Sequence, residues 1–164
     1  MAKPVAQWPV GTFDLWAPAG VAPTLTSMPA TTPADPGVLP AAECLRLLRG
    51  GRVGRVVYTD AAIPMATPVN FVLDGEAVVF RTRSGSRLAK ATRDAVVSFQ
   101  VDGIDEVTAS GWSVIITGIS EALDGVDRLH AERLPLVSWA GDDRDHIVRI
   151  PASVVSGCRV GPDG

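Results

Sequence analysis

The chain has 164 residues, 46% of them hydrophobic and 20% charged, and a formal net charge of −3. This length predicts one folded domain and is too short for two domains of typical size. The acidic balance argues against nucleic-acid binding, which requires a broad basic face, and favours a small ligand. No apolar stretch is long enough for a membrane span and no signal-peptide core is present, so the sequence predicts a cytoplasmic protein. Cys44 and Cys158 are predicted to be free thiols, because they form neither a CxxC motif nor a disulfide framework.

Residues 1–39 are predicted to form an extended arm outside the folded domain. Eight of the 13 prolines lie within residues 1–40, so neither helix nor strand is expected to persist there. The segment WPVGTFDLW (8–16) is densely apolar, which is unusual for a solvated tail. Two alternatives remain: the arm packs on its own dimer, which the preference for local burial favours, or it docks to a partner protein.

The domain, residues 40–164, is predicted to begin with a short helix at PAAECLRLLRGG (40–51), which the Gly50-Gly51 pair ends. Asp74-Gly75, between two apolar runs, predicts a hairpin in which both turn residues have positive φ. Short segments rich in Val and Ile predict six strands and two further helices. The strands are expected at 52–59, 65–73, 76–82, 95–102, 111–120 and 153–160, and the helices at 86–94 and 125–136. This pattern indicates an α+β protein built on a small antiparallel β-barrel.

The segment RTRSGSRLAKATR (81–93) carries five Lys and Arg residues and no acidic residue. Two guanidinium groups (Arg81, Arg87), two hydroxyl groups (Thr82, Ser86) and free backbone N–H groups at a helix start are donors that bind phosphate. The alternative is a solvated basic turn that keeps a short helix soluble. Asn70 favours the phosphate site, because it places a polar amide in an otherwise apolar strand just before this segment.

Three further features carry weaker signals. Trp112 and Ser113 open a strand, where a core Trp and a ligand contact are equally plausible. The run DDRDH (142–146) is interpreted as a solvated loop and not as a metal site, because no Cys is near and His130 is the one other His. His130 itself is predicted on an exposed helix face. No catalytic residue and no metal site is assigned.

The order of these segments resembles a known family. A short helix is followed by GRV, PVNF, an Asp-Gly turn, VVFRT, a Gly-Ser-Arg-Leu helix start, VSFQVD, GWSVIITG and a late HIVRI and VSGCRV. Over about residues 40–160 this resembles the pyridoxamine 5′-phosphate oxidase-like split β-barrel flavoproteins. The resemblance implies a six-stranded antiparallel split β-barrel with short flanking helices, dimeric, binding FMN, or in some branches the deazaflavin F420, in a groove between two identical barrels. It also implies an oxidoreductase acting on an unidentified small molecule. The alternatives are an F420-dependent reductase and a non-catalytic flavin-binding or interaction module.

The resemblance further implies which residues bind the cofactor. Those expected along the isoalloxazine are Pro68, Val69 and Asn70, and those expected around the ribityl phosphate are Arg81, Thr82, Ser86, Arg87 and Leu88. Those expected to approach from the other subunit or a facing strand are Trp112 and Ser113. A flavin supplies the redox chemistry itself, which agrees with the lack of an apparent acid–base pair. The Arg-Leu-x-Pro end of the authentic oxidase has no counterpart in GCRVGPDG, which argues against pyridoxamine phosphate as the substrate.

Overall fold

The computed structural model describes residues 37–137 and 145–161. The chain divides into two units, 1–32 and 33–164, and the fold below is that of the second. The predictions for residues 1–36, including the segment WPVGTFDLW, lie outside the described residues. No helix in the described part of the chain is long and apolar enough to cross a membrane.

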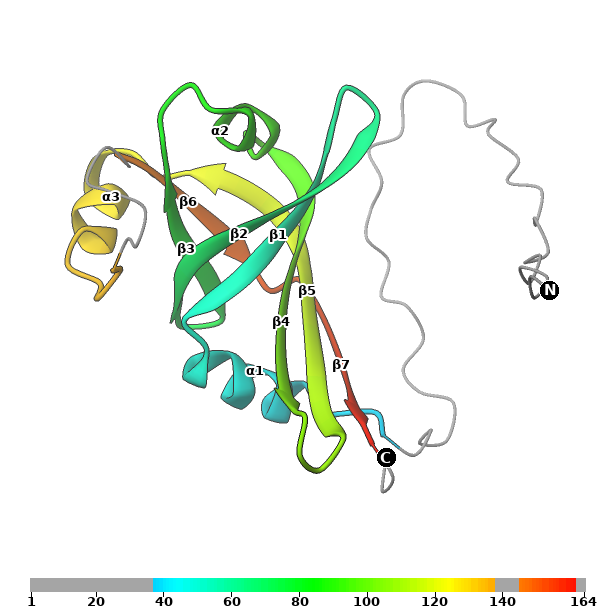
Figure 1. Ribbon diagram of the computed structural model, residues 1–164. Helices are drawn as coiled ribbons and strands as arrows, with labels where there is room; N and C mark the ends of the chain where they lie inside the picture. Colours follow the sequence, from blue (N-terminus) through cyan, green and yellow to red (C-terminus); the bar gives the residue numbers. More distant parts are fainter. Residues whose placement is uncertain (1–36, 138–144, 162–164) are drawn as a thin grey trace, which may run out of the picture. The chain divides into compact units, whose positions relative to one another are not determined.

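The described residues form seven strands and three short helices, and every strand pair is antiparallel (Figure 1). In chain order these are α1 (Ala41–Gly50), β1 (Val53–Asp60), β2 (Ile63–Asp74), β3 (Ala77–Thr82), α2 (Arg87–Ala91), β4 (Ala95–Asp105), β5 (Ser110–Ala122), α3 (Gly125–Ala131), β6 (His146–Pro151) and β7 (Val154–Val160). The antiparallel barrel with a few short helices is therefore confirmed.

Six strands close into a ring in the order β4-β1-β2-β3-β6-β5, because β5 also pairs with β4. The sixth strand of this ring differs from the prediction. The predicted strand at 153–160 is β7, which pairs with β5 outside the ring, whereas β6 was missing from the prediction. His146, assigned to a solvated loop, is instead the first residue of β6. The charged run DDRDH favoured the prediction of a loop, although the strand that follows it has two fully buried residues, Val148 and Ile150.

Two tight hairpins join β1 to β2 and β2 to β3. In the first, Ala61 and Ala62 both have positive φ, 49° and 66°. In the second, Asp74 pairs with Ala77, so the two loop residues are Gly75 and Glu76. The predicted hairpin exists, but the prediction of Asp74-Gly75 as a turn with two positive φ angles is wrong. Gly75, with φ 62°, occupies the first loop position, where a type II′ turn requires Gly.

The barrel interior is filled by alternate residues of the strands, since successive side chains point to opposite faces. Fully buried examples are Val56, Phe80, Phe99, Ile116 and Ile150. Helix α1 covers one end of the barrel with Cys44 and Leu48, both 0% exposed, and the predicted helix at this position is confirmed.

A second, smaller core lies outside the barrel, where α3 packs on β3 and β6. Its buried members are Val79, Leu123, Ala131 and Ile147. Both α2 and α3 are shorter than predicted and end at Ala91 and Ala131. The left-handed backbone of Asp94, with φ 50°, lies beyond the end of α2, and Pro135 interrupts the helical pattern after α3.

The last residues of the predicted arm belong to the folded unit. Val38 forms a β-bridge with Cys158, and the N–H of Leu39 donates to the carbonyl of Gly157 at 2.9 Å. Leu39 is 7% exposed. These contacts pair Gly37–Leu39 with β7, so the folded unit includes residues before Pro40. Both cysteines are free, as predicted, with Cys44 buried and Cys158 exposed.

Candidate functional site

A groove of about 410 Å³ lies beside the end of β3 and the start of α2. Its lining comes from β1, β2, β3 and α2 and from the loop between β3 and α2. The lining residues are Tyr58, Thr67, Pro68, Thr82, Arg83, Ser86, Arg87 and Leu88. Five of the ten predicted cofactor-binding residues therefore share one concave surface, which combines hydroxyl groups with guanidinium groups.

Two hydroxyl groups that line this groove lie within hydrogen-bonding distance of each other. Thr82 ends β3 and is 4% exposed, and its Oγ1 lies 3.2 Å from Ser86 Oγ. Ser86 is the N-cap of α2, and its Oγ accepts a hydrogen bond from the N–H of Ala89 at 3.0 Å. The hydroxyl itself therefore caps this five-residue helix, which leaves fewer free N–H groups there than predicted.

Two guanidinium groups, those of Arg83 and Arg87, also line the groove. Arg87 Nε lies 3.9 Å from Asp60 Oδ2, and 79% of the Arg87 side chain is exposed. Such a long, solvated ion pair contributes little to stability, so Arg87 can turn to a bound anion at low cost. Arg83, one of the five basic residues of the segment 81–93, also lines the groove.

The loop between β3 and α2 is anchored from both sides. The N–H of Ser86 donates to the carbonyl of Arg83 at 3.1 Å. The N–H of Ser84 donates to Asp145 Oδ1 at 3.3 Å, just before β6. Hydrogen bonds from Ser84 lower the pKa of the Asp145 carboxyl group. This anchoring holds the two arginines and Ser86 at the groove.

The floor of the groove contains a hydroxyl pair that the sequence prediction missed. Tyr58 on β1 and Thr67 on β2 lie side by side, with 3.1 Å between Tyr58 Oη and Thr67 Oγ1. Tyr58 is 6% exposed and occupies the same face of β1 as Val56. The sequence did contain a signal for this pair. In RVGRVVYT the alternation of the strand places Tyr58 on the buried face, and a buried tyrosine hydroxyl requires a hydrogen-bond partner.

Besides Asn70, four predicted residues lie outside this groove. Val69 is buried in the barrel core. Arg81 occupies the face of β3 opposite to Thr82, and its Nε is buried without a hydrogen-bond partner in the described part of the chain. Trp112 and Ser113 pair with β4 and β7 and do not line the groove of this subunit. The predicted cofactor roles of these residues stay predictions.

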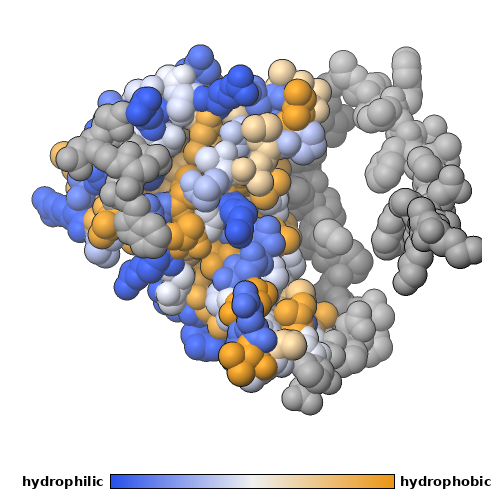
Figure 2. Space-filling model, viewed as in Figure 1, coloured by the Kyte–Doolittle hydropathy of each residue, from blue (hydrophilic) through white to orange (hydrophobic). Residues whose placement is uncertain are grey.

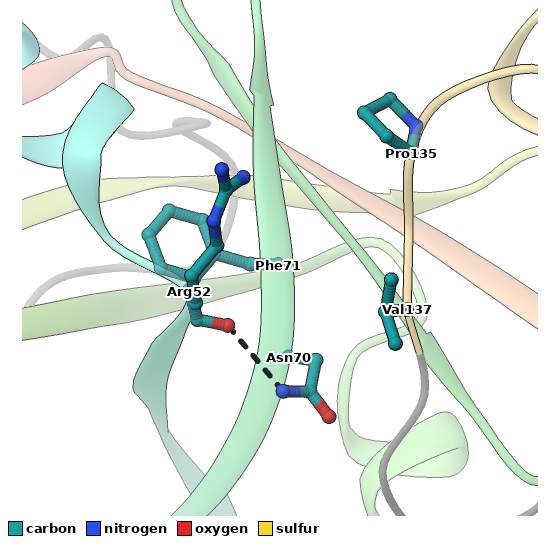
Figure 3. Close-up of a pocket in the computed structure, with 5 residues that line it drawn as sticks. All are labelled: Arg52, Asn70, Phe71, Pro135 and Val137. Carbon is teal, nitrogen blue, oxygen red and sulfur yellow. Dashed lines mark hydrogen bonds between the residues drawn. The ribbon is translucent and has the colours of Figure 1, made fainter.

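Asn70 lines a second pocket, of about 390 Å³, which we call the Arg52 pocket (Figure 3). Its lining residues are Arg52, Asn70, Phe71, Pro135 and Val137. Asn70 Nδ2 donates to the carbonyl of Arg52 at 3.4 Å. Pro68 and Asn70 share the outer face of β2 and are two residues apart, which is about 7 Å along a strand. The groove and the Arg52 pocket are therefore neighbours on the same strand.

The chain is similar to several known proteins. The family model described as pyridoxamine 5′-phosphate oxidase matches residues 40–159, which confirms the resemblance predicted from the sequence. The uncharacterized protein Rv0080 of Mycobacterium tuberculosis is 34% identical over 127 residues, covering 74% of this chain and 83% of that protein. The structure of the FAD binding protein from Mycobacterium smegmatis shares 32% identity, with a TM-score of 0.66 over 76% of this chain and 98% of that one. A conserved protein of unknown function from Corynebacterium diphtheriae shares 33% identity, with a TM-score of 0.64 over 77% and 99%.

Proposed function

Because the chain belongs to the pyridoxamine 5′-phosphate oxidase family, we propose that it is an oxidoreductase that binds FMN in the groove beside α2. The observation that carries this proposal is the convergence of Thr82, Ser86, Arg83 and Arg87 on one groove. Guanidinium and hydroxyl donors are the groups that bind a phosphate dianion. The residues present therefore fit the phosphate end of a flavin nucleotide.

Residues along β2 support a position for the ring system of the cofactor. Thr67 and Pro68 line the groove, and Asn70 lines the neighbouring Arg52 pocket. A flavin with its phosphate beside Ser86 would extend its ring system along the outer face of β2 toward Asn70. When bound, the flavin would supply the hydride or electron transfer, while the chain supplies binding and orientation.

Three flavin species, FMN, FAD and F420, are candidates for the cofactor. The relative from M. smegmatis is described as FAD binding, which supports a flavin but differs from FMN. F420 also carries a phosphate and would use the same donors. The test is the absorbance spectrum of the purified protein together with mass spectrometry of the released ligand. Recovery of FMN supports the proposal, and a colourless protein that binds no flavin contradicts it.

We also propose that the protein is a homodimer. On the outer face of β4, β5 and β7, four apolar side chains are exposed by 39 to 65%: Val96, Ile115, Ile119 and Val154. Val96 and Ile119 are direct cross-strand partners, and Val154 pairs with Thr117, which lies between Ile115 and Ile119 on β5. We call these four apolar residues, which surround the polar pair Ser98 and Thr117, the outer apolar face. Patches of this kind on a sheet are typical of protein interfaces. Figure 2 shows more apolar surface near the end of the β4–β5 hairpin, where Ile104 and Val107 are exposed.

A second candidate function is a non-catalytic flavin-binding module. The observation that favours it is that no carboxylate or imidazole is among the described residues that line the groove. Oxidation of NADH or NADPH by the flavin-loaded protein, with oxygen or a quinone as the acceptor, distinguishes the two. Turnover supports the oxidoreductase, and tight flavin binding without turnover of any donor supports the module.

A further inference from the structure

The Arg52 pocket has one polar wall and one apolar wall. Figure 3 shows Arg52 and Asn70 on one side, with Pro135 and Val137 across from them on the segment that follows α3. This segment is distant in sequence from β1 and β2 and reaches the pocket because α3 packs on the outside of the barrel. At about 390 Å³ the pocket is within the size range of sites for small molecules.

The backbone of Arg52, the residue just before β1, is held by two hydrogen bonds. Its carbonyl oxygen accepts hydrogen bonds from the N–H of Phe71 at 3.2 Å and from Asn70 Nδ2 at 3.4 Å. The Arg52 side chain, in contrast, makes no hydrogen bond or ion pair with any described residue. Arg55, three residues later on β1, differs, because its guanidinium pairs with Asp102 at 3.2 Å. Among the described residues, the Arg52 guanidinium therefore has no counter-charge, while its backbone is held by two hydrogen bonds.

Apart from Arg52 and Asn70, the described residues that line the pocket are apolar. Val137 is 65% exposed and Pro135 is also exposed, so two apolar side chains are open to a ligand opposite the cation. Phe71 is 2% exposed and packs edge-on against Phe99 with ring centroids 4.8 Å apart, which makes the floor rigid. One guanidinium group matches one carboxylate in two-pronged geometry, and the apolar wall suits a ring or a short hydrocarbon.

We propose that the Arg52 pocket binds a small apolar monocarboxylate, held by Arg52 and packed against Pro135 and Val137. Its assignment as the substrate site rests on the proposed function, because a flavin ring lying along Pro68 and Asn70 would border this pocket. The oxidoreductase would then act on an aromatic or short aliphatic acid. A phosphorylated compound is not expected as the substrate, because the phosphate-binding side chains lie in the groove beside α2 and not in the Arg52 pocket.

The test uses para-fluorobenzoate and its neutral isostere para-fluorobenzamide as probes, titrated into the full-length protein and followed by fluorine NMR. We expect the benzoate to bind about tenfold more tightly than the amide or better, since a charge-assisted pair with Arg is lost in the amide. Arg52→Gln should remove this preference by weakening the benzoate alone, and Arg52→Lys should restore part of it. Arg49→Gln, a matched change of a nearby exposed arginine in α1, should leave both affinities unchanged.

Equal binding of the two probes, absence of binding, or an equal loss in Arg49→Gln would overturn the proposal. FMN affinity of the same variants is measured separately and should not change in Arg52→Gln. Benzoate binding by a protein that binds no flavin would overturn the assignment of the pocket as the substrate site. Flavin binding without benzoate binding would leave the proposed flavin groove intact and remove this inference alone.

Discussion

Thr82 Oγ1 and Ser86 Oγ lie 3.2 Å apart, and Ser86 Oγ also accepts the N–H of Ala89. The end of β3 is therefore linked directly to the first turn of α2. Because Ser86 caps this helix, its hydroxyl has a structural role as well as the proposed role in phosphate binding. Two substitutions can separate these roles.

Ser86→Ala removes the cap and the phosphate donor, and we expect it to lower the free energy of unfolding by about 1 kcal/mol. Ser86→Gly removes the same donor but should cost only a few tenths of a kcal/mol, since Gly is tolerated at an N-cap. Both variants should weaken FMN by a similar factor of about five to ten. Urea denaturation and flavin fluorescence titration give the two quantities. An FMN affinity that follows the stability of each variant would assign Ser86 to the helix cap alone.

Arg87→Ala should weaken FMN by about tenfold or more and leave riboflavin nearly unchanged, because only FMN carries the phosphate. The 3.9 Å contact with Asp60 is too weak for its loss to destabilise the fold. The measurement is titration of the apoprotein with both flavins. Arg46→Ala, which removes an exposed arginine paired with Glu43 on α1, is the control. An equal loss for FMN and riboflavin would place Arg87 away from the phosphate.

The sequence allowed prediction of those site residues that are local in the chain. Thr82, Ser86 and Arg87 lie within six residues of each other, so their proximity requires only a turn before a helix. Tyr58 and Thr67 reach the groove because β1 pairs with β2 and that hairpin lies beside α2, which depends on long-range packing. The alternation of side chains along a strand also allows the prediction that Arg81 and Thr82 lie on opposite faces of β3.

The missed strand has a different cause. Strand β6 pairs with β3, and this pairing brings Ile150 into the barrel core beside its direct partner Val78. Its short apolar run follows the charged segment DDRDH, and charge in the sequence favoured a loop. The position of β6 in the ring also depends on β5, because Glu121 and Ala122 at the end of β5 pair with β6. No local pattern carries that information.

Gly118 marks the place where β5 passes from its pairing with β7 to its pairing with β6. A Cβ atom at Gly118 would overlap the carbonyl oxygen of Pro151, which is backbone and cannot rotate away. We expect Gly118→Ala to lower the free energy of unfolding by about 1 to 3 kcal/mol. Gly50→Ala, at a glycine with open space around it, should be neutral or slightly stabilising. Urea denaturation checks both, and similar stability of the two variants would contradict the proposed close approach.

Glu43 couples α1 to β7 in a pH-dependent way. Hydrogen bonds from Arg46, aided by the charges of Arg46 and Arg159, lower the pKa of Glu43 below its usual value of 4.5. A carboxyl whose pKa is lower in the folded state stabilises the protein above its unfolded pKa and loses this contribution as pH falls through the folded value. Glu43→Gln should therefore be slightly less stable than the wild type at neutral pH. The difference should shrink in acid.

Urea denaturation of both proteins across this pH range gives the comparison. Glu106→Gln, in the turn between β4 and β5, is the matched control, since Glu106 has no ion pair with a described residue. A wild-type advantage that stays constant into acid would show that Glu43 acts through packing and not through its charge.

Ile119→Lys tests the proposed dimer through the outer apolar face. Ile119 is 52% exposed and is the cross-strand partner of Val96, so a lysine there places a charge within the outer apolar face without entering the core. We expect the wild type to be a dimer and Ile119→Lys to be a monomer by light scattering after size-exclusion chromatography. Val126→Lys, at an 81% exposed position of α3, should remain dimeric.

If the flavin lies between two barrels, the monomeric variant should also lose affinity for FMN, although none of the groove residues has changed. Circular dichroism and thermal unfolding would verify that the variant is folded. A monomer with unaltered FMN affinity would mean that the groove beside α2 is complete within one subunit, and the expected contributions of Trp112 and Ser113 from a partner would then be excluded. Retention of the dimer would move the interface to another surface.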